Sequence, residues 1–92
     1  MEKDKRYKGV KRLLESGDLT EFNQIFEHIP KSVIASAIGT ARDRFNFKME
    51  HIEKFTLEDL IAIGKYLEVD DMMIVFQLAW NQYQQQKKKK RK

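Results

Sequence analysis

Apolar residues recur at intervals of three and four along most of the chain, which is the spacing expected of helices that bury one face. The first such segment contains Tyr7, Val10, Leu13 and Leu14, and Gly17 is predicted to end it. No alternating valine-rich run and no Asn-Gly hairpin turn occurs in the sequence. The pattern therefore predicts an all-α fold, a compact bundle of five to six helices.

A second helix is predicted between residues 18 and 29. Asp18 and Glu21 form an N-terminal capping pair, in which the first side chain accepts from the new helix and the second reaches back. The apolar face of this helix comprises Leu19, Phe22, Ile25, Phe26 and Ile29. Pro30 marks its end because proline has no backbone N–H, and the fixed φ of proline suits the first turn of the next helix.

Residues 30–49, PKSVIASAIGTARDRFNFKM, predict two short helices joined at Gly39. Glycine adopts the left-handed conformation that ends a helix, and Thr40 is predicted to cap the second one. Ala35 is small enough to let the two helices cross closely, and Phe45 falls on the side of the second helix that must face the core. We therefore interpret this segment as a helix-turn-helix.

Two further helices are predicted after a connector at residues 50–55. Thr56 and Asp59 mark the start of the first. Its core-facing stripe comprises Leu57, Leu60, Ile61, Gly64 and Leu67. Residues 68–70 read as a short break before the last helix, which either Asp70 or Asp71 caps.

The last helix contains the run MMIVFQLAW, which is apolar on more than one face. Since a surface helix keeps one polar face, this helix is either enclosed within the monomer or shared with a second chain. We expect burial within the monomer ahead of a homodimer through the C-terminal helix. Trp80 and Tyr83 on this helix are interpreted as packing groups rather than as a platform on which bases stack.

The composition restricts the class of protein. The chain has 92 residues, of which 41% are hydrophobic, enough for one modest core. Residues 1–86 are interpreted as a single helical domain, and residues 87–92 as a disordered basic tail. The absence of cysteine excludes disulfides and thiolate metal sites. Because the sequence contains neither an apolar run of membrane-spanning length nor a secretory leader, we expect a soluble, cytoplasmic protein.

Positive charge is concentrated at the two ends of the chain and on the predicted helix-turn-helix. Residues 1–12 carry six basic and two acidic side chains, and residues 87–92 carry six basic ones. Since the whole chain totals +4, residues 13–86 carry a net charge of −6. Within them, residues 30–49 hold four basic side chains against Asp43 alone. This distribution suits a polyanion that docks on one face, whereas the lysine tail alone is typical of a solubilising run.

The segment from Phe22 to Leu78 resembles the DNA-binding domain of the phage repressor and Cro family, with the recognition pair as the second and third of five helices. The small and apolar positions that carry the resemblance are Ile34, Ala35, Ile38, Gly39 and Phe45. The later stretch FTLEDLIAIGKYLEVD is similar to the helix and turn that follow in the family. The chain is also similar to small uncharacterised bacterial proteins of this type, which share an IPKS-like start, RFN within the second helix and a later FTLEDL. The N-terminal helix is an addition to the basic repressor domain.

The resemblance implies double-stranded DNA as the partner and transcriptional regulation as the function. Lys31 and Ser32 would meet phosphate at the start of the first motif helix. The second helix would enter the major groove, where Arg42 would donate to two acceptors of a guanine. Arg44 and Lys48 would hold backbone phosphate. The full set of implied DNA-binding residues is Lys31, Ser32, Thr40, Ala41, Arg42, Asp43, Arg44, Asn46, Phe47 and Lys48, of which Ala41, Asp43, Asn46 and Phe47 would also face base edges.

Three of these residues depart from the family pattern and leave other functions open. Phe47 occupies a position that is usually polar, so it contacts either a thymine methyl or a protein. Lys48 stands where an apolar residue is expected, and Asp43 is repelled by phosphate unless it accepts from a cytosine amine or pairs with an arginine. The alternative is a noncatalytic interaction module on the same fold, which binds a protein through Phe47 and the last helix. A third hypothesis is sequence-independent nucleic-acid binding by the basic ends.

No pattern in the sequence indicates an enzyme, a cofactor or a small-molecule substrate. His28 and His51 lie far apart, without the spacing of metal ligands. The serines have no triad partners in context, and the four glycines form no phosphate-binding loop. The carboxylates at 58–59 and 70–71 suit helix starts, where negative charge is favourable, rather than paired catalytic acids.

Overall fold

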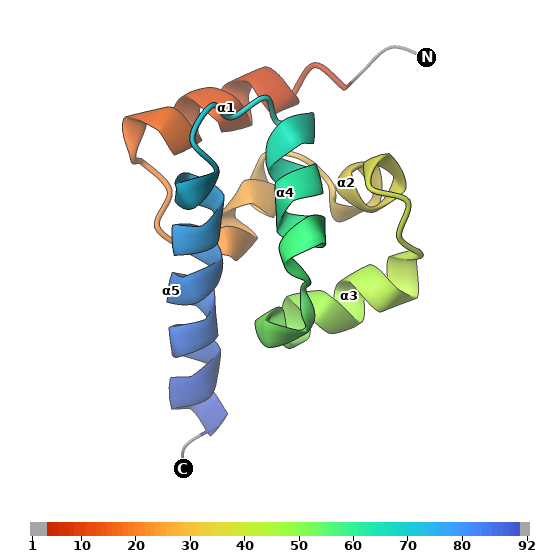
Figure 1. The fold of residues 1–92 in the computed structure, drawn as a ribbon, viewed down its shortest axis with the longest axis vertical. Helices are drawn as coiled ribbons and strands as arrows, with labels where there is room; N and C mark the ends of the chain where they lie inside the picture. Colours follow the sequence, from red (N-terminus) through yellow and green to blue (C-terminus); the bar gives the residue numbers. More distant parts are fainter. Residues whose placement is uncertain (1–3, 91–92) are drawn as a thin grey trace.

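A computed structural model describes residues 4–90, with side chains described through Lys88. These residues form an all-α bundle and contain no strand (Figure 1). The elements in chain order are α1 (Tyr7–Ser16), the 3₁₀ helix η1 (Phe22–Glu27), α2 (Lys31–Ala37), α3 (Arg42–Glu50), the 3₁₀ helix η2 (Ile52–Lys54), α4 (Leu57–Tyr66) and α5 (Met72–Lys90). The all-α fold predicted from the sequence is confirmed.

Helices α4 and α5 lie side by side, and α1 runs across one end of the bundle (Figure 1). α5 also contacts both 3₁₀ helices, while α2 packs against α3 and α4. α3 lies towards the other end of the molecule, away from α1 (Figure 1). Within the described residues, no helix has the length and apolar character needed to cross a membrane.

The core is formed by the apolar sides that these helices turn towards one another. Its largest fully buried side chains are Phe22, Phe45, Leu14, Ile25, Ile29, Ile34, Ile63, Leu67, Val10 and Val75. Four phenylalanines form a closed ring of edge-to-face contacts in the order Phe22, Phe26, Phe45 and Phe55, with centroids of neighbouring rings 5.5–5.6 Å apart. Such pairs contribute about 0.5–1.5 kcal/mol each beyond the area they bury. Phe22 and Phe26 belong to η1, Phe45 belongs to α3, and Phe55 follows η2. This phenylalanine cluster therefore joins three segments of the chain.

Several predicted helix boundaries are confirmed. Gly17, with φ 80°, ends α1 in the left-handed conformation. At the start of α4, Asp59 N donates to Thr56 Oγ1 at 3.0 Å and Thr56 N donates to Asp59 Oδ2 at 3.1 Å, which completes the predicted capping pair. Of the two candidates at the start of α5, Asp71 is the cap, since its Oδ1 accepts from Met73 N at 3.0 Å.

The helix predicted for residues 18–29 is a shorter 3₁₀ helix in the structure. Asp18 does not cap it; its carboxylate accepts from the Ser16 hydroxyl at 2.7 Å instead. The side chain of Gln24 takes over this role, with Oε1 accepting from Glu21 N at 2.9 Å and from Thr20 N at 2.7 Å. These bonds hold the chain extended through Glu21, so the helix begins only at Phe22.

The predicted core stripe of α4 is wrong at its first position. Leu57 is 64% exposed, whereas Ile63, which lies outside the predicted stripe, is fully buried. The cause is the position of α5, whose Met72 packs so closely on Gly64 that a β-carbon there would collide with the methionine sulfur. α4 therefore turns its Ile63 and Gly64 side towards α5, and Leu57 in its first turn faces solvent.

α5 buries only one of its sides. Val75, Leu78, Ala79 and Gln82 are buried. In contrast, Met73 is 65% exposed and Trp80 is 54% exposed. The expectation that the monomer encloses this helix holds for one side. The interpretation of Trp80 and Tyr83 as packing groups is confirmed for Tyr83, which packs against the core, and is wrong for Trp80.

The predicted boundary between domain and tail also differs from the structure. α5 continues without a break through residues 87–90, which were expected to be disordered. The rest of that predicted tail, residues 91–92, lies outside the described residues, as do residues 1–3 of the domain.

Candidate nucleic-acid interface

All of the predicted DNA-binding residues lie within residues 30–50, named here the α2–α3 unit. At the end of α2, Gly39 has φ 74° and its N–H donates to Ser36 O at 3.1 Å. The next amide, Thr40 N, donates to Ala35 O at 2.9 Å. These two bonds satisfy carbonyls at the helix end and turn the chain into α3. The left-handed glycine predicted from the sequence is confirmed.

Thr40 lies in this turn and does not cap α3, contrary to the prediction. The N-cap residue of α3 is Ala41, and no side chain there accepts a hydrogen bond from the first turn. Backbone amides at such a helix start carry partial positive charge. The exposed start of α3 therefore provides a favourable environment for an anion.

The two sides of α3 differ sharply. Phe45 is fully buried, and Met49 is nearly so. The outward side contains the exposed residues Arg42, Asp43, Arg44, Asn46, Phe47 and Glu50. Phe45 also belongs to the phenylalanine cluster, so the core fixes the rotation of α3 about its axis. This rotation determines which side chains of α3 face solvent.

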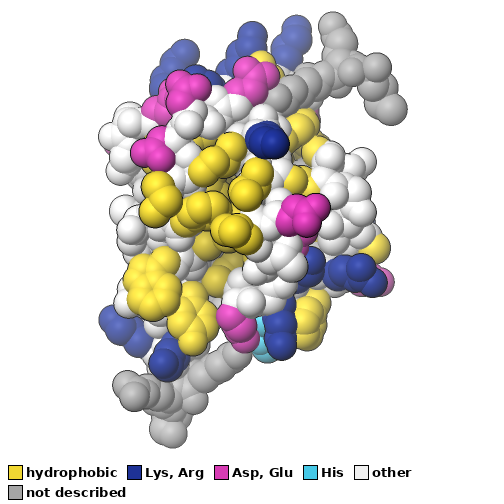
Figure 2. Space-filling model, in the orientation of Figure 1, with side chains coloured by type: hydrophobic (Ala, Val, Ile, Leu, Met, Phe, Trp, Pro, Cys, Tyr) yellow, Lys and Arg dark blue, Asp and Glu magenta, His cyan; other side chains and the backbone are white. Residues whose placement is uncertain are grey.

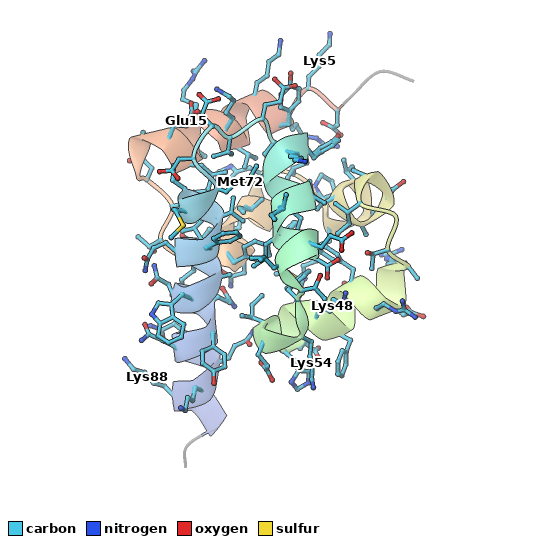
Figure 3. All side chains as sticks on the ribbon, viewed as in Figure 1. Lys5, Glu15, Lys48, Lys54, Met72 and Lys88 are labelled. Carbon is cyan, nitrogen blue, oxygen red and sulfur yellow. The ribbon has the colours of Figure 1, made fainter. Side chains whose placement is uncertain are left out.

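Lys48 does not belong to this outward side. Its Nζ donates to Asp59 Oδ2 at 2.7 Å, across to α4 (Figure 3), and lies 5.9 Å from the centre of the Phe55 ring. Both charged side chains are largely buried, with 16% and 19% exposure. The role of phosphate contact predicted for Lys48 is therefore revised: its ammonium group is already neutralised by a carboxylate inside the protein.

Asp59 links the cap of α4 to this ion pair. Partial burial raises the pKa of its carboxyl, but hydrogen bonds from Lys48 and Thr56 outweigh burial and hold the pKa below the ordinary value. The carboxylate is thus charged at neutral pH, and the same oxygen accepts from both Lys48 and the backbone of Thr56. This contact fixes the C-terminal half of α3 against α4.

The basic residues of the α2–α3 unit other than Lys48 are exposed. Lys31 and Ser32 lie in the first turn of α2, and Arg42 and Arg44 in the first turn of α3. Within the described part of the chain, neither arginine takes part in an ion pair. Figure 2 shows Lys and Arg side chains, with acidic ones among them, at the lower right, where Figure 1 places α3.

Phe47 is the one large hydrophobic side chain on the outward side of α3, and it is 51% exposed. Its ring lies 4.7 Å from the ring of His51 at an angle of 39°. Since His51 is half-buried at the end of the helix, this contact supports one side of the phenyl ring. The other side of the ring remains available to a partner.

Two glutamines of α5 form hydrogen bonds to neighbouring segments, and neither role is predicted from the sequence. The side-chain amide of Gln86 donates to Met49 O at 2.7 Å and accepts from Ile52 N at 3.0 Å, so it bridges the end of α3 and the start of η2. Gln82 accepts from Asn23 N at 3.1 Å. In the sequence these residues lie in a polar run, NQYQQQ, that gives no signal distinguishing the buried Gln82 and the partly buried Gln86 from the exposed Gln84 and Gln85.

Comparisons with protein-family models, with curated proteins and with solved structures find no match. Among the residues that the structure describes, no three His, Asp or Glu side chains gather in a way that would hold a metal ion. A functional proposal for this chain therefore rests on the arrangement of its own side chains.

Proposed function

We propose that the protein is a sequence-specific DNA-binding protein that acts in transcriptional regulation and uses α2 and α3 as a helix-turn-helix. The observation that carries this proposal is the orientation of α3. Phe45 and Met49 are buried, whereas Arg42, Arg44 and Asn46 face outward. A helix anchored in this way presents one fixed side, and the major groove of B-DNA is wide enough to admit it.

Arg42 is assigned the base contact. It is the first residue of α3, and the N-terminal residues of a recognition helix are the ones that reach base edges in this class of motif. The planar guanidinium donates to O6 and N7 of a guanine at once. Arg44 and Lys31, both exposed, are assigned to backbone phosphates, which position the helix without reading sequence.

The other predicted residues keep their proposed roles, except Lys48. Ser32 is assigned to phosphate beside Lys31, and Thr40, Ala41 and Asn46 to the groove around Arg42. Asp43 is proposed to accept from a cytosine amine, and Phe47 to contact a thymine methyl. Lys48 is left out because Asp59 already neutralises it.

The competing proposal is a noncatalytic protein-binding module on the same fold. The observation that favours it is Phe47, whose ring is half exposed beside His51. Exposed aromatic side chains are typical anchors of protein interfaces. In that case Phe47 is the central contact, and Arg42 and Arg44 contribute to solubility only.

A mobility-shift titration against random and genomic duplexes, at low and moderate salt, separates these proposals. Arg42→Ala is expected to weaken the preferred duplex about 5- to 100-fold, the scale of one bidentate base contact, and to change random duplex binding much less. Lys65→Ala, which removes an exposed lysine from α4, is the matched control and is expected to have little effect. A chain truncated after Gln86 is expected to weaken all duplexes alike and to lower the salt dependence.

Two outcomes contradict the proposal. Binding that disappears only on truncation assigns the interaction to the basic C-terminal residues. An absence of binding by any variant favours the protein-binding module.

For the assembly of the protein, we propose a homodimer through α5. Two copies related by a twofold axis would read a site made of two halves. Light scattering on the same samples tests this prediction. A monomer at high concentration removes the two-part site and leaves the contact by α3 in place.

A further inference from the structure

The outer side of α5 carries two neighbouring aromatic rings, of which Tyr83 packs partly against the core and Trp80 is mostly exposed. Trp80 and Tyr83 lie one turn apart, with ring centroids 5.8 Å apart and ring planes inclined by 31°. More than half of Trp80 is exposed. Beside the rings is an open hollow of about 290 Å³, lined by Ile52, Glu53, Phe76, Ala79, Trp80 and Tyr83. Apart from one carboxylate, the side chains that line it are apolar or aromatic.

One lysine, Lys87, follows directly on the same side of the helix. Lys87 comes four residues after Tyr83 and seven after Trp80, which are spacings of about one and two helical turns. Lys87 and Lys88 are both exposed, and Figure 3 shows Lys88 and Lys54 towards the same end of the molecule. The two rings thus stand at the border of a strongly basic region.

We propose that Trp80, Tyr83, Lys87 and the adjoining hollow form a site for single-stranded nucleic acid. Unpaired bases stack on the two rings, and the phosphates of the strand lie along the lysines. Aromatic platforms beside a basic track are the general means of holding single strands, because every base has a π-face. A duplex hides those faces, so this site is separate from the contact between α3 and duplex DNA.

The surroundings of the rings favour a strand over other partners. The apolar side of α5 continues from Trp80 to Phe76 and Met73, but it is basic towards the C-terminal end, and Gln77 and Gln84 are exposed on the flank of Trp80. A homodimer through this side of α5 would cover the rings and therefore compete with the strand. Glu53 repels phosphate and therefore directs the strand backbone towards Lys87, with a base edge facing the carboxylate.

Tryptophan fluorescence tests the site directly, because Trp80 is the only tryptophan of the chain. Short oligo(dT) is expected to quench its emission at low salt, and added salt is expected to reverse the quenching. An abasic oligomer of the same length keeps the phosphates but has no bases to stack. It is expected to leave the emission nearly unchanged.

Variants separate stacking from charge. In an anisotropy assay with labelled oligo(dT), Trp80→Ala is expected to weaken binding about tenfold or more, the scale of one lost stacked base. Met73→Ala, which truncates another apolar side chain of the same helix that is more than half exposed, is the matched control and is expected to bind as the unchanged protein does. Lys87→Ala is expected to flatten the logarithmic salt dependence by about 0.7, the value for one phosphate contact to a single strand.

Several results would overturn the inference. If the abasic oligomer quenches the emission equally, binding depends on charge alone and no base stacks on the rings. A blue-shifted emission with anionic phospholipid vesicles, in the absence of any effect of oligo(dT), assigns the surface to membranes. Emission that changes with protein concentration but not with oligo(dT) assigns it to a homodimer.

The failure of this inference is distinguishable from the failure of the proposed function. Duplex binding that depends on Arg42, without quenching by oligo(dT), removes the single-strand site only. If the protein binds no duplex, but oligo(dT) still quenches Trp80 in both the unchanged protein and Arg42→Ala, the proposed function fails and the single-strand site stands.

Discussion

Helices α3 and α5 each leave one aromatic side chain about half exposed, but the surroundings of the two rings differ. On α3, Phe47 lies beside His51 and one turn from Asp43, Arg44 and Glu50. Arg42 and Asn46 are also exposed on this short helix, whose N-terminus has no side-chain cap. On α5, Trp80 lies beside a second ring and an apolar hollow, with lysines only at the end of the helix. Planar donors at a helix start suit the edges of paired bases, whereas rings beside lysines suit the faces of unpaired ones. The net charge of +4 does not distinguish these two surfaces, whereas the residues next to each aromatic side chain do.

The two helices also differ in what holds them. α5 is 19 residues long and buries a continuous side of its own. α3 has nine residues and is held by contacts with other segments. These are the phenylalanine cluster, which includes Phe45, the hydrogen bond from Lys48 to Asp59, and the hydrogen bond from Gln86 to Met49 O. The geometry of the proposed duplex contact is therefore set by residues that would never touch DNA.

The largest expected effect contrasts the two phenylalanines of α3. Phe45→Ala removes a fully buried ring and is expected to lower the free energy of unfolding by about 3–5 kcal/mol, while Phe47→Ala is expected to change it by no more than about 0.5 kcal/mol. Urea unfolding of both variants measures the difference. Similar losses for the two variants would show that α3 is not oriented as described.

A smaller effect is expected at the bridge between α5 and α3. Gln86→Ala leaves Met49 O and Ile52 N without their side-chain partner, and is expected to cost about 1–2 kcal/mol of unfolding free energy. Gln85→Ala, one residue earlier and exposed, is the matched control with an expected change near zero. Hydrogen exchange of the amides in residues 45–52 is expected to accelerate in Gln86→Ala alone. Equal protection in both variants would mean that α5 does not hold α3.

The smallest of the three effects depends on pH. Asp59→Asn removes the charge that pairs with Lys48 and is expected to cost about 1 kcal/mol at pH 7, measured by urea unfolding. Because the pKa of Asp59 is lowered in the folded protein, its contribution is complete above the ordinary aspartate pKa of about 3.9 and is lost as pH falls through the folded value. The difference between the variant and the unchanged protein should therefore narrow below about pH 4.

The neighbouring Glu58→Gln serves as the control for this pH dependence. Glu58 is exposed on the same helix turn, so its substitution is expected to be nearly neutral at every pH. A stability difference for Asp59→Asn that stays constant from pH 7 to pH 3 would contradict the assigned ion pair.

The sequence predicts those parts of the fold that depend on local rules. Gly17 and Gly39 end helices in the left-handed conformation, and Thr56 with Asp59 caps α4, because each of these signals acts within a few residues. The inward direction of Phe45 follows from the helical period in the same way. The all-α fold and the outward set on α3 were therefore accessible before the structure.

What the sequence does not predict depends on contacts between distant segments. From the sequence, Lys48 is predicted to be a surface cation. In the structure it donates a hydrogen bond to Asp59 on α4, eleven residues along the chain. The sequence predicts Trp80 as a packing residue because the run around it is apolar on more than one face. The positions of α1, η1, α4 and η2 decide which faces are covered. The roles of Gln82 and Gln86 depend on segments that are 59 and 34–37 residues away.

The most direct test of the central claim is a map of duplex DNA on the chain by NMR. Backbone amide shifts are recorded while a duplex selected for binding is added to the protein. The shifts are expected to concentrate on residues 40–47 and the first turn of α2, and Arg42→Ala is expected to remove them. Shifts confined to residues 80–90, with α3 unaffected, would contradict the central claim.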